Sequence, residues 1–243
     1  MKLIHPIFIY CAVFAWLNLA WITPQRLKNG RTNTTHKLSV ADSLQKQNSL
    51  LYQLFNLEPL GLSRKAFDYA IKGYRLLSEK RLLANPGFLT ICDFSQSSRN
   101  KRMYLLDMTE LKVILTTYVA HGRNSGGEYA TKFSNRPESL QSSLGFYTTS
   151  GTYYGEHGLS LRMKGLEKGY NDKAFARNIV VHGAQYLGDK WLNQSDCMGR
   201  SFGCPAIPQE QSAQIIDIIK DGTCLFIYHP TINYLQHSKI LND

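Results

Sequence analysis

The hydrophobic period of the chain changes at Asn85-Pro86-Gly87, and this change limits the possible folds more than any other feature. Before it, apolar residues recur at helical spacing after Ser63, a plausible N-cap, and trace one face: Phe67, Ala70, Ile71, Tyr74 and Leu77. After it, short β-branched or aromatic runs alternate with polar turns, which is typical of strands. These runs are 88–94, 101–107, 111–120, 145–149, 157–163, 178–181 and 223–228.

Residues 209–220 return to a helical period, with Ile215, Ile216 and Ile219 on one side. We therefore expect an α+β protein that is mainly β. Helices precede a mostly antiparallel sheet or barrel, and one helix lies near the C-terminus.

The amino terminus predicts export. Lys2 is followed by residues 3–22 without a formal charge, the pattern of a signal peptide or, at about the length that spans a bilayer, of a membrane anchor. Residues 1–22 are thus predicted to be a signal peptide or inner-membrane anchor, and residues 23–37 a flexible tether. Residues 38–85 are predicted to be a helical N-terminal subdomain, and residues 86–243 the main domain. The location is then the periplasm or cell envelope.

Composition narrows the class of partner. Lys and Arg exceed Asp and Glu by 28 − 18 = 10, so the surface suits an anionic polymer or lipid. The basic residues are scattered and the chain is exported, which argues against nucleic acid. An aromatic content of 12% and the lack of a repeat exclude disordered and fibrous proteins.

Four cysteines remain after the export segment, which contains Cys11. They are Cys92, Cys197, Cys204 and Cys224. In an oxidising compartment they could form two disulfides. A domain of this size does not depend on disulfides for stability, so at least one thiol could be kept for chemistry.

Two segments carry candidate chemistry. Ile179-Val180-Val181-His182-Gly183 is an apolar run that delivers a histidine and a glycine, and Ser201-Phe202-Gly203-Cys204-Pro205 places a cysteine on a turn. A thiol is only slightly ionised near neutral pH and needs a base, which an imidazole can supply. The Gly183 carbonyl could fix the imidazole tautomer. Gly203 could let consecutive N–H groups converge on an oxyanion.

These segments resemble the signature of the L,D-transpeptidase (YkuD-like) family of bacterial cell-wall enzymes. Further segments are similar to its murein L,D-transpeptidase catalytic domain branch: 119–122, 132–135, 142–147, 154–162 and 165–167. The resemblance covers roughly residues 60–230 and makes 86–243 an L,D-transpeptidase-like catalytic domain. It implies a YkuD-like β-sandwich or open barrel with Cys and His at one end of the sheet.

The resemblance also implies a reaction. The cysteine attacks the carbonyl between an L- and a D-residue of a peptidoglycan stem peptide, and an amine of a neighbouring stem, or water, resolves the thioester. Cys204 is then the nucleophile, His182 the general base and later acid, and Gly183 the carbonyl that orients the base. The Gly203 and Cys204 amides are the oxyanion donors, and Ser201 shapes the turn. No cofactor and no metal is needed, and the partners are stem peptides.

Two positions depart from the family pattern. Phe202 replaces a histidine that we interpret as a supporting residue, and Pro205-Ala206 replaces a polar or basic residue that helps to hold the acyl donor. Substrate binding must then come from elsewhere. By type and neighbourhood, the candidates are Arg200, Arg162, Tyr147, Tyr153 and His121.

Other interpretations stay open at this stage. A zinc hydrolase could draw ligands from His121, His157, His182, Cys197 and Cys204, although none has a tight ligand spacing. The chain could be a non-catalytic wall-binding protein on the same fold, or an L,D-carboxypeptidase. His121-Gly122 and His157-Gly158 are interpreted as turns, and a Cys197–Cys204 disulfide as a conceivable redox switch.

Overall fold

The computed structural model describes residues 32–242, with side chains from Asp42 onward. The chain divides into two units, residues 1–41 and 42–243. The predicted export segment, residues 1–22, lies outside the described residues. Among the residues that are described, no helix has both the length and the apolar character needed to cross a membrane.

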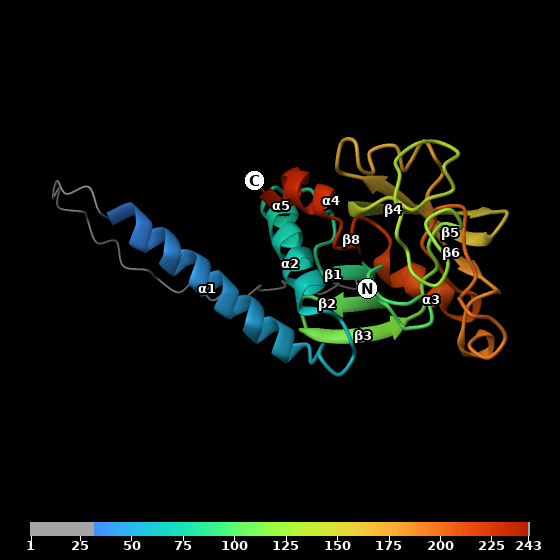
Figure 1. The fold of residues 1–243 in the computed structure, drawn as a ribbon, viewed down its shortest axis with the longest axis horizontal. Coiled ribbons are helices and arrows are strands. Elements are labelled where there is room, and N and C mark those ends of the chain that lie inside the picture. The colour runs from blue at the N-terminus through green and yellow to red at the C-terminus, as the bar shows by residue number, and fades with distance from the viewer. Residues whose placement is uncertain (1–31, 243) are drawn as a thin grey trace, which may run out of the picture. The chain divides into compact units, whose positions relative to one another are not determined.

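The centre of the protein is one eight-stranded mixed sheet with the order β3-β2-β1-β8-β4-β5-β6-β7 (Figure 1). Five of its seven strand pairs are antiparallel, while β1–β8 and β6–β7 are parallel. The expected α+β, mainly β class is confirmed. The strands are β1 Phe88–Asp93, β2 Met103–Asp107, β3 Lys112–Thr117, β4 Gly145–Gly155, β5 Gly158–Gly165, β6 Val180–Ala184, β7 Ala206–Pro208 and β8 Cys224–Tyr228.

The helices pack on this sheet through apolar faces. The Ser63 side chain accepts a hydrogen bond from the Ala66 amide, as an N-cap should, and α2 buries Phe67, Ala70 and Ile71 in the same core as the strands. Burial of these apolar faces stabilises the packing of the helix on the sheet, with a free energy of about 25 cal/mol per Å2 of apolar area buried. The helices are α1 Thr32–Leu54, α2 Arg64–Glu79, α3 Gln209–Ile219, α4 Ile232–His237 and α5 Lys239–Asn242, with a short 3-10 turn at Asp189–Trp191.

Three expectations can be compared with the structure. Helix α1 begins at Thr32, so residues 32–37 of the expected tether are helical; they contain no Gly or Pro to prevent it. Residues 23–31 of that tether lie outside the described residues. The boundary at residue 85 does not separate two cores, because α2 and the sheet share one. Two short helices, α4 and α5, follow the last strand in addition to the expected C-terminal helix.

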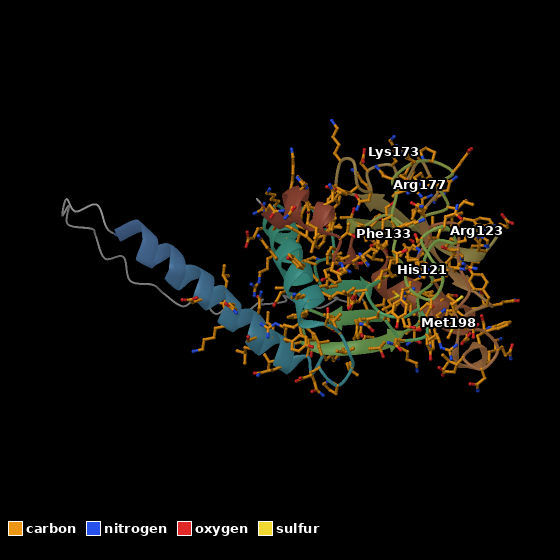
Figure 2. All side chains as sticks on the ribbon, viewed as in Figure 1. His121, Arg123, Phe133, Lys173, Arg177 and Met198 are labelled. Carbon is orange, nitrogen blue, oxygen red and sulfur yellow. The ribbon has the colours of Figure 1, made fainter. Side chains whose placement is uncertain are left out.

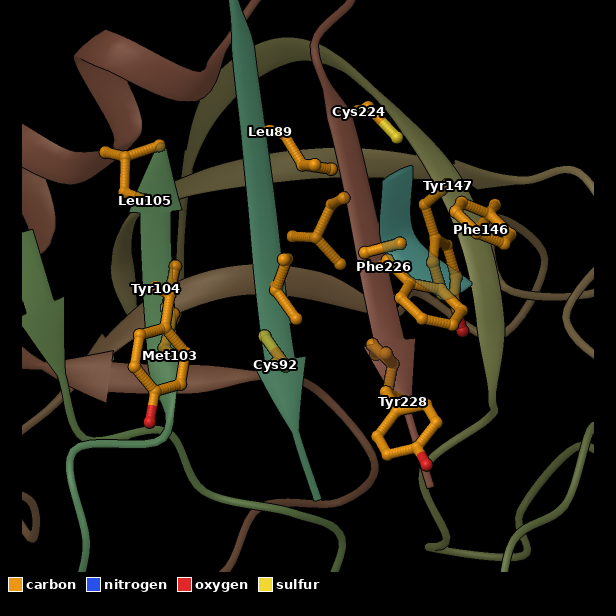
Figure 3. Close-up of a cluster of buried hydrophobic side chains, with 14 of the residues drawn as sticks. Leu89, Cys92, Met103, Tyr104, Leu105, Phe146, Tyr147, Cys224, Phe226 and Tyr228 are labelled. Carbon is orange, nitrogen blue, oxygen red and sulfur yellow. The ribbon is translucent and has the colours of Figure 1, made fainter. Parts of the chain in front are cut away.

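Two of the cysteines are core residues. Cys92 on β1 and Cys224 on β8 are fully buried among apolar side chains, in the cluster that also contains the stacked rings of Phe146 and Phe226 (Figure 3). Burial raises the pKa of the Cys92 thiol to about 12, and it raises the pKa of Cys224 as well. All four cysteines of the described region are free, so the disulfides considered from the sequence are not formed in this structure.

Candidate active site

The Cys204 side chain lies beside the start of strand β6. Strands β6 and β7 run parallel with His182 opposite Ala206, which places Cys204 near Val180. The Val180 amide donates a hydrogen bond to Cys204 Sγ at 3.5 Å, and the thiol donates to the Asn178 carbonyl at 3.7 Å. The sulfur thus accepts the Val180 N–H bond at the place where a backbone group would otherwise continue the hydrogen bonding between β6 and β7.

These surroundings keep the thiol protonated. Burial raises the pKa of the Cys204 thiol above its ordinary value, and the Val180 N–H and the Arg177 guanidinium oppose this by favouring the thiolate. Because the rise prevails, Cys204 rests as a neutral thiol near pH 7. A base must therefore remove its proton when it attacks.

His182 is held as a neutral base. Its Nδ1 lies 2.8 Å from the Gly183 carbonyl oxygen, and a carbonyl can only accept, so Nδ1 carries the proton and Nε2 has a free lone pair. Burial lowers the pKa of His182 below 6.5; the Gly183 carbonyl raises it and His157 lowers it. A Cβ on Gly183 would lie 2.6 Å from Gln209 Oε1 and 2.7 Å from Ser212 Oγ, so a larger residue would force these α3 side chains to shift.

The thiol and the imidazole belong to the same corner of the sheet and are not hydrogen bonded to each other among the described residues. Val180 and His182 are two residues apart on β6 and so share a face.

A second imidazole stacks on His182. The His157 and His182 rings lie 4.2 Å apart between centroids, with an interplanar angle of 20°. His157 comes from the turn between β4 and β5, and its outer surface is exposed. The sequence interpretation of His157-Gly158 as a turn holds for its location but missed the stacking. The repeated His-Gly pair was the available signal.

Hydrogen bonds shape the turn at residues 201–204. Ser201 Oγ donates to the Cys204 carbonyl at 2.6 Å and accepts from the Gly203 amide at 3.1 Å. Gly203 has φ +122°, and a Cβ there would lie 2.8 Å from the Gln141 carbonyl oxygen, so glycine is required. The Gly203 amide, expected from the sequence as an oxyanion donor, donates to Ser201 Oγ in this structure.

Arg177 joins the turn to a long loop, and the sequence interpretation missed it. Its guanidinium donates to Ser143 Oγ, to Ser139 Oγ and to two backbone carbonyls, those of Ser134 and Gln141. It also favours the Cys204 thiolate. Figure 2 shows Arg177 on the same side of the molecule as Phe133 and Lys173. Because half of its partners are carbonyls, no side-chain pattern in the sequence could have revealed this role.

Two of the expected substrate-binding residues are inaccessible. Tyr147 is fully buried, and its hydroxyl donates to the Ser143 carbonyl at 2.9 Å. His121 is also fully buried, and its Nδ1 lies 2.8 Å from a nitrogen of the Arg102 guanidinium, itself buried. Burial and the Arg102 charge lower the pKa of His121 to about 4. We therefore withdraw Tyr147 and His121 as substrate contacts.

The other three candidates lie at cavities beside the turn at residues 201–204. Arg162 is opposite Val180 on the neighbouring strand and stacks over the Tyr153 ring at 4.1 Å. Both line a small cavity of about 100 Å3, together with Asn178 and Val180, the two residues in contact with the thiol. Arg200 lines a larger cavity of about 360 Å3 on the side of Phe202.

The zinc alternative lacks a ligand set. In the part of the chain that the structure describes, no three His, Cys, Asp or Glu side chains gather as a metal site would require. His121 is instead paired with Arg102, and His157 is stacked on His182. Cys197 and Cys204 are both free, so nothing in this structure supports the disulfide switch.

Comparison with known families decides the class of this protein. The family model of the L,D-transpeptidase catalytic domain matches residues 59–228, which is more than half of the chain. The chain belongs to the L,D-transpeptidase catalytic domain family. The match begins before α2 and ends with β8, so this family's domain in our chain includes α2.

Solved L,D-transpeptidase structures are similar at low identity. One from Mycobacterium smegmatis is 11% identical, with 59% of each chain covered and a TM-score of 0.36. One from Stackebrandtia nassauensis is 13% identical, with 68% of this chain and 67% of that chain covered and a TM-score of 0.36. Our chain thus spans 59% of the length of the M. smegmatis protein. No curated protein matches the sequence.

Proposed function

We propose that this L,D-transpeptidase family member is a peptidoglycan acyltransferase that uses Cys204 as its nucleophile. The observation that carries the proposal is the arrangement on β6. The thiol is hydrogen bonded to the Val180 amide. Two residues farther along β6, His182 has its Nδ1 fixed on Gly183, and its Nε2 has no hydrogen-bond partner among the described residues. A neutral thiol and a neutral imidazole are the protonation states that general-base attack requires.

The reaction begins with a change of the Cys204 χ1 rotamer. In the resting arrangement the sulfur is bound to backbone groups of Asn178 and Val180, so it must leave them to reach His182 and the substrate. His182 Nε2 then takes the thiol proton while Sγ attacks the carbonyl between the L- and D-residues of a stem peptide. His182 returns that proton to the departing amine of the D-residue, and a thioester remains on Cys204.

The oxyanion that forms during attack needs N–H donors. The Cys204 amide has no partner among the described hydrogen bonds, so it is our candidate donor. The Gly203 amide is occupied by Ser201, whose role in this proposal is to hold the turn in shape. One such donor contributes on the order of 3 kcal/mol to transition-state stabilisation.

Covalent adduct formation tests the proposal. Full-length protein incubated with a carbapenem should gain the mass of one ring-opened molecule, and Cys204→Ala should gain none. Cys197→Ala is the matched control, since Cys197 is also free and partly exposed, and it should still gain the adduct on Cys204. Equal labelling of Cys204→Ala and the wild type would refute the assignment of the nucleophile.

Product analysis identifies the acceptor. With tetrapeptide muropeptides as substrate, cross-linked dimers indicate an amine acceptor, whereas tripeptides indicate water and therefore L,D-carboxypeptidase activity. Recovery of unchanged substrate, with no adduct on Cys204, would favour a non-catalytic wall-binding protein. We further propose that the protein acts outside the cytoplasm, because its proposed substrate is there. Inner-membrane anchoring through residues 1–22 remains a sequence prediction.

A further inference from the structure

We propose that the cavity on the Phe202 side of the catalytic turn binds a carboxylate-bearing stretch of a stem peptide, and that Arg123 and Arg200 recognise the carboxylate. This inference rests on the proposed function, since it assigns a substrate site next to the same thiol. The cavity measures about 360 Å3, within the range of ligand-binding pockets. Its lining combines arginines with aromatic and small side chains: Arg123, Tyr186, Trp191, Met198, Arg200 and Phe202, with Ser195, Cys197 and Gly199.

The cavity adjoins the reaction centre. Phe202 is two residues before Cys204, and the backbone of Arg123 is bonded to the turn, since its amide donates to the Ser201 carbonyl at 2.7 Å. Tyr186 is near enough to Cys204 that a thiolate there adds to the effect of burial, which raises the pKa of Tyr186 to about 12. A ligand in this cavity therefore lies against the segment that carries the nucleophile. Figure 2 shows Arg123 and Met198 in the part of the view where Figure 1 labels β5, β6 and α3.

Both arginines have free donors. Arg200 makes one side-chain hydrogen bond, to the Gly126 carbonyl at 3.2 Å, and Arg123 lies 5.9 Å over the Phe202 ring without a hydrogen bond of its own among the described side chains. Neither forms an ion pair within the described residues, and no lining residue is acidic. A planar guanidinium with free N–H groups matches a carboxylate bidentately.

The aromatic walls make the site suitable for a peptide and not only for a small anion. Phe202 is 64% exposed although it is a large apolar residue on a conformationally constrained turn. Trp191 is anchored, because its indole N–H donates to the Gln185 carbonyl at 2.7 Å. Rigid aromatic surfaces of this kind gain apolar contact with a ligand at little entropic cost. In this chain the Phe202 side chain therefore forms one wall of the cavity.

Both partners of a transpeptidation carry carboxylates, so the shared chemistry is a carboxylate-bearing stem and the experiment separates the two sources. Binding is measured by calorimetry on full-length Cys204→Ala, which cannot turn over. The donor probe is a tetrapeptide stem with a terminal L–D bond. The acceptor probe is a tripeptide stem with a free side-chain amine and no such bond. Each is compared with a form in which all carboxylates are amidated.

We expect the free-acid form of one probe to bind about 10- to 100-fold more tightly than its amidated form, because charge-assisted hydrogen bonds are lost. Arg123→Gln or Arg200→Gln in the same background should remove most of this preference, and the lysine variants should restore part of it. Arg136→Gln is the control, since Arg136 is exposed, has the same charge and lies outside this cavity.

Equal binding of acid and amide, or no binding of either probe, would overturn the inference. An equal loss in Arg136→Gln would do the same, because it would show a general charge effect. The proposed function is tested separately by the thioester on wild-type Cys204. If the thioester forms but the free-acid and amidated probes bind equally, only the cavity assignment is refuted. If the free-acid probe binds more tightly but no thioester forms, only the catalytic proposal is refuted.

Discussion

The stacking of His157 on His182 should set both the rate and the pH dependence of acylation. His157→Ala removes one face of a ring pair whose centroids are 4.2 Å apart. Such pairs contribute about 0.5–1.5 kcal/mol beyond the area they bury. If that energy holds the imidazole in its productive orientation, the plateau rate of acylation falls about 2- to 12-fold.

The pH profile should move in a definite direction. Burial lowers the pKa of His182, and the positive charge of protonated His157 lowers it further. Removing His157 exposes the ring and deletes that charge, so both changes raise the pKa of His182. The neutral base then forms only at higher pH, and the acid limb of the acylation rate shifts to higher pH.

Stopped-flow acylation by a carbapenem, measured between pH 4.5 and 8.5, reports both quantities. His157→Phe separates them, since it keeps a ring on His182 but removes the charge: its plateau should stay near that of the wild type while its acid limb shifts. Tyr154→Ala is the control, because Tyr154 is 84% exposed in the same hairpin. A His157→Ala profile identical to that of the wild type would refute the reasoning.

Three further results are expected. Gly203→Ala should destabilise the protein by about 1–3 kcal/mol in urea unfolding and abolish acylation, because φ is +122° and the new Cβ meets the Gln141 carbonyl at 2.8 Å; wild-type stability would contradict this. Arg177→Gln should lower the rate of acylation and make residues 134–143 susceptible to proteolysis, because four hydrogen bonds to this loop are lost. An unchanged rate and unchanged proteolysis would show that these hydrogen bonds are dispensable. The free energy of unfolding should fall by on the order of 3 kcal/mol between pH 6.5 and pH 4. The reason is that the pKa of His121, beside Arg102, is about 4 in the folded state, so in this pH range the unfolded state takes up a proton more readily than the folded state. The same slope in His121→Gln would assign that pH dependence to other groups.

The parts of the site that could be predicted are those whose chemistry lies in local sequence. His182-Gly183 and the turn 201–204 carry their own spacing, and the Nδ1–carbonyl contact follows from two adjacent residues. The helix face of α2 and its Ser63 cap likewise depend on residues within a few turns. The placement of Arg177 could not be predicted, because its partners lie on a loop more than 30 residues away.

The tyrosines show why burial could not be predicted either. Tyr147 and Tyr153 are six residues apart on β4, so a regular strand would give them the same face. The pairing of β4 with β5 shifts register between Thr149 and Thr152. Such a bulge reverses the alternation. Tyr147 therefore lies in the core and Tyr153 beside Arg162 at the small cavity.

Strand β8 determines when this protein can complete its sheet. It lies between β1 and β4 and so joins the group β3-β2-β1 to the group β4-β5-β6-β7. Its register pairs Leu89 with Cys224, residues separated by most of the domain. Pairing across so long a stretch of chain makes folding slow, and it cannot occur until β8 has been synthesised. A chain that stops before residue 224 therefore lacks the strand that joins the two halves of the sheet.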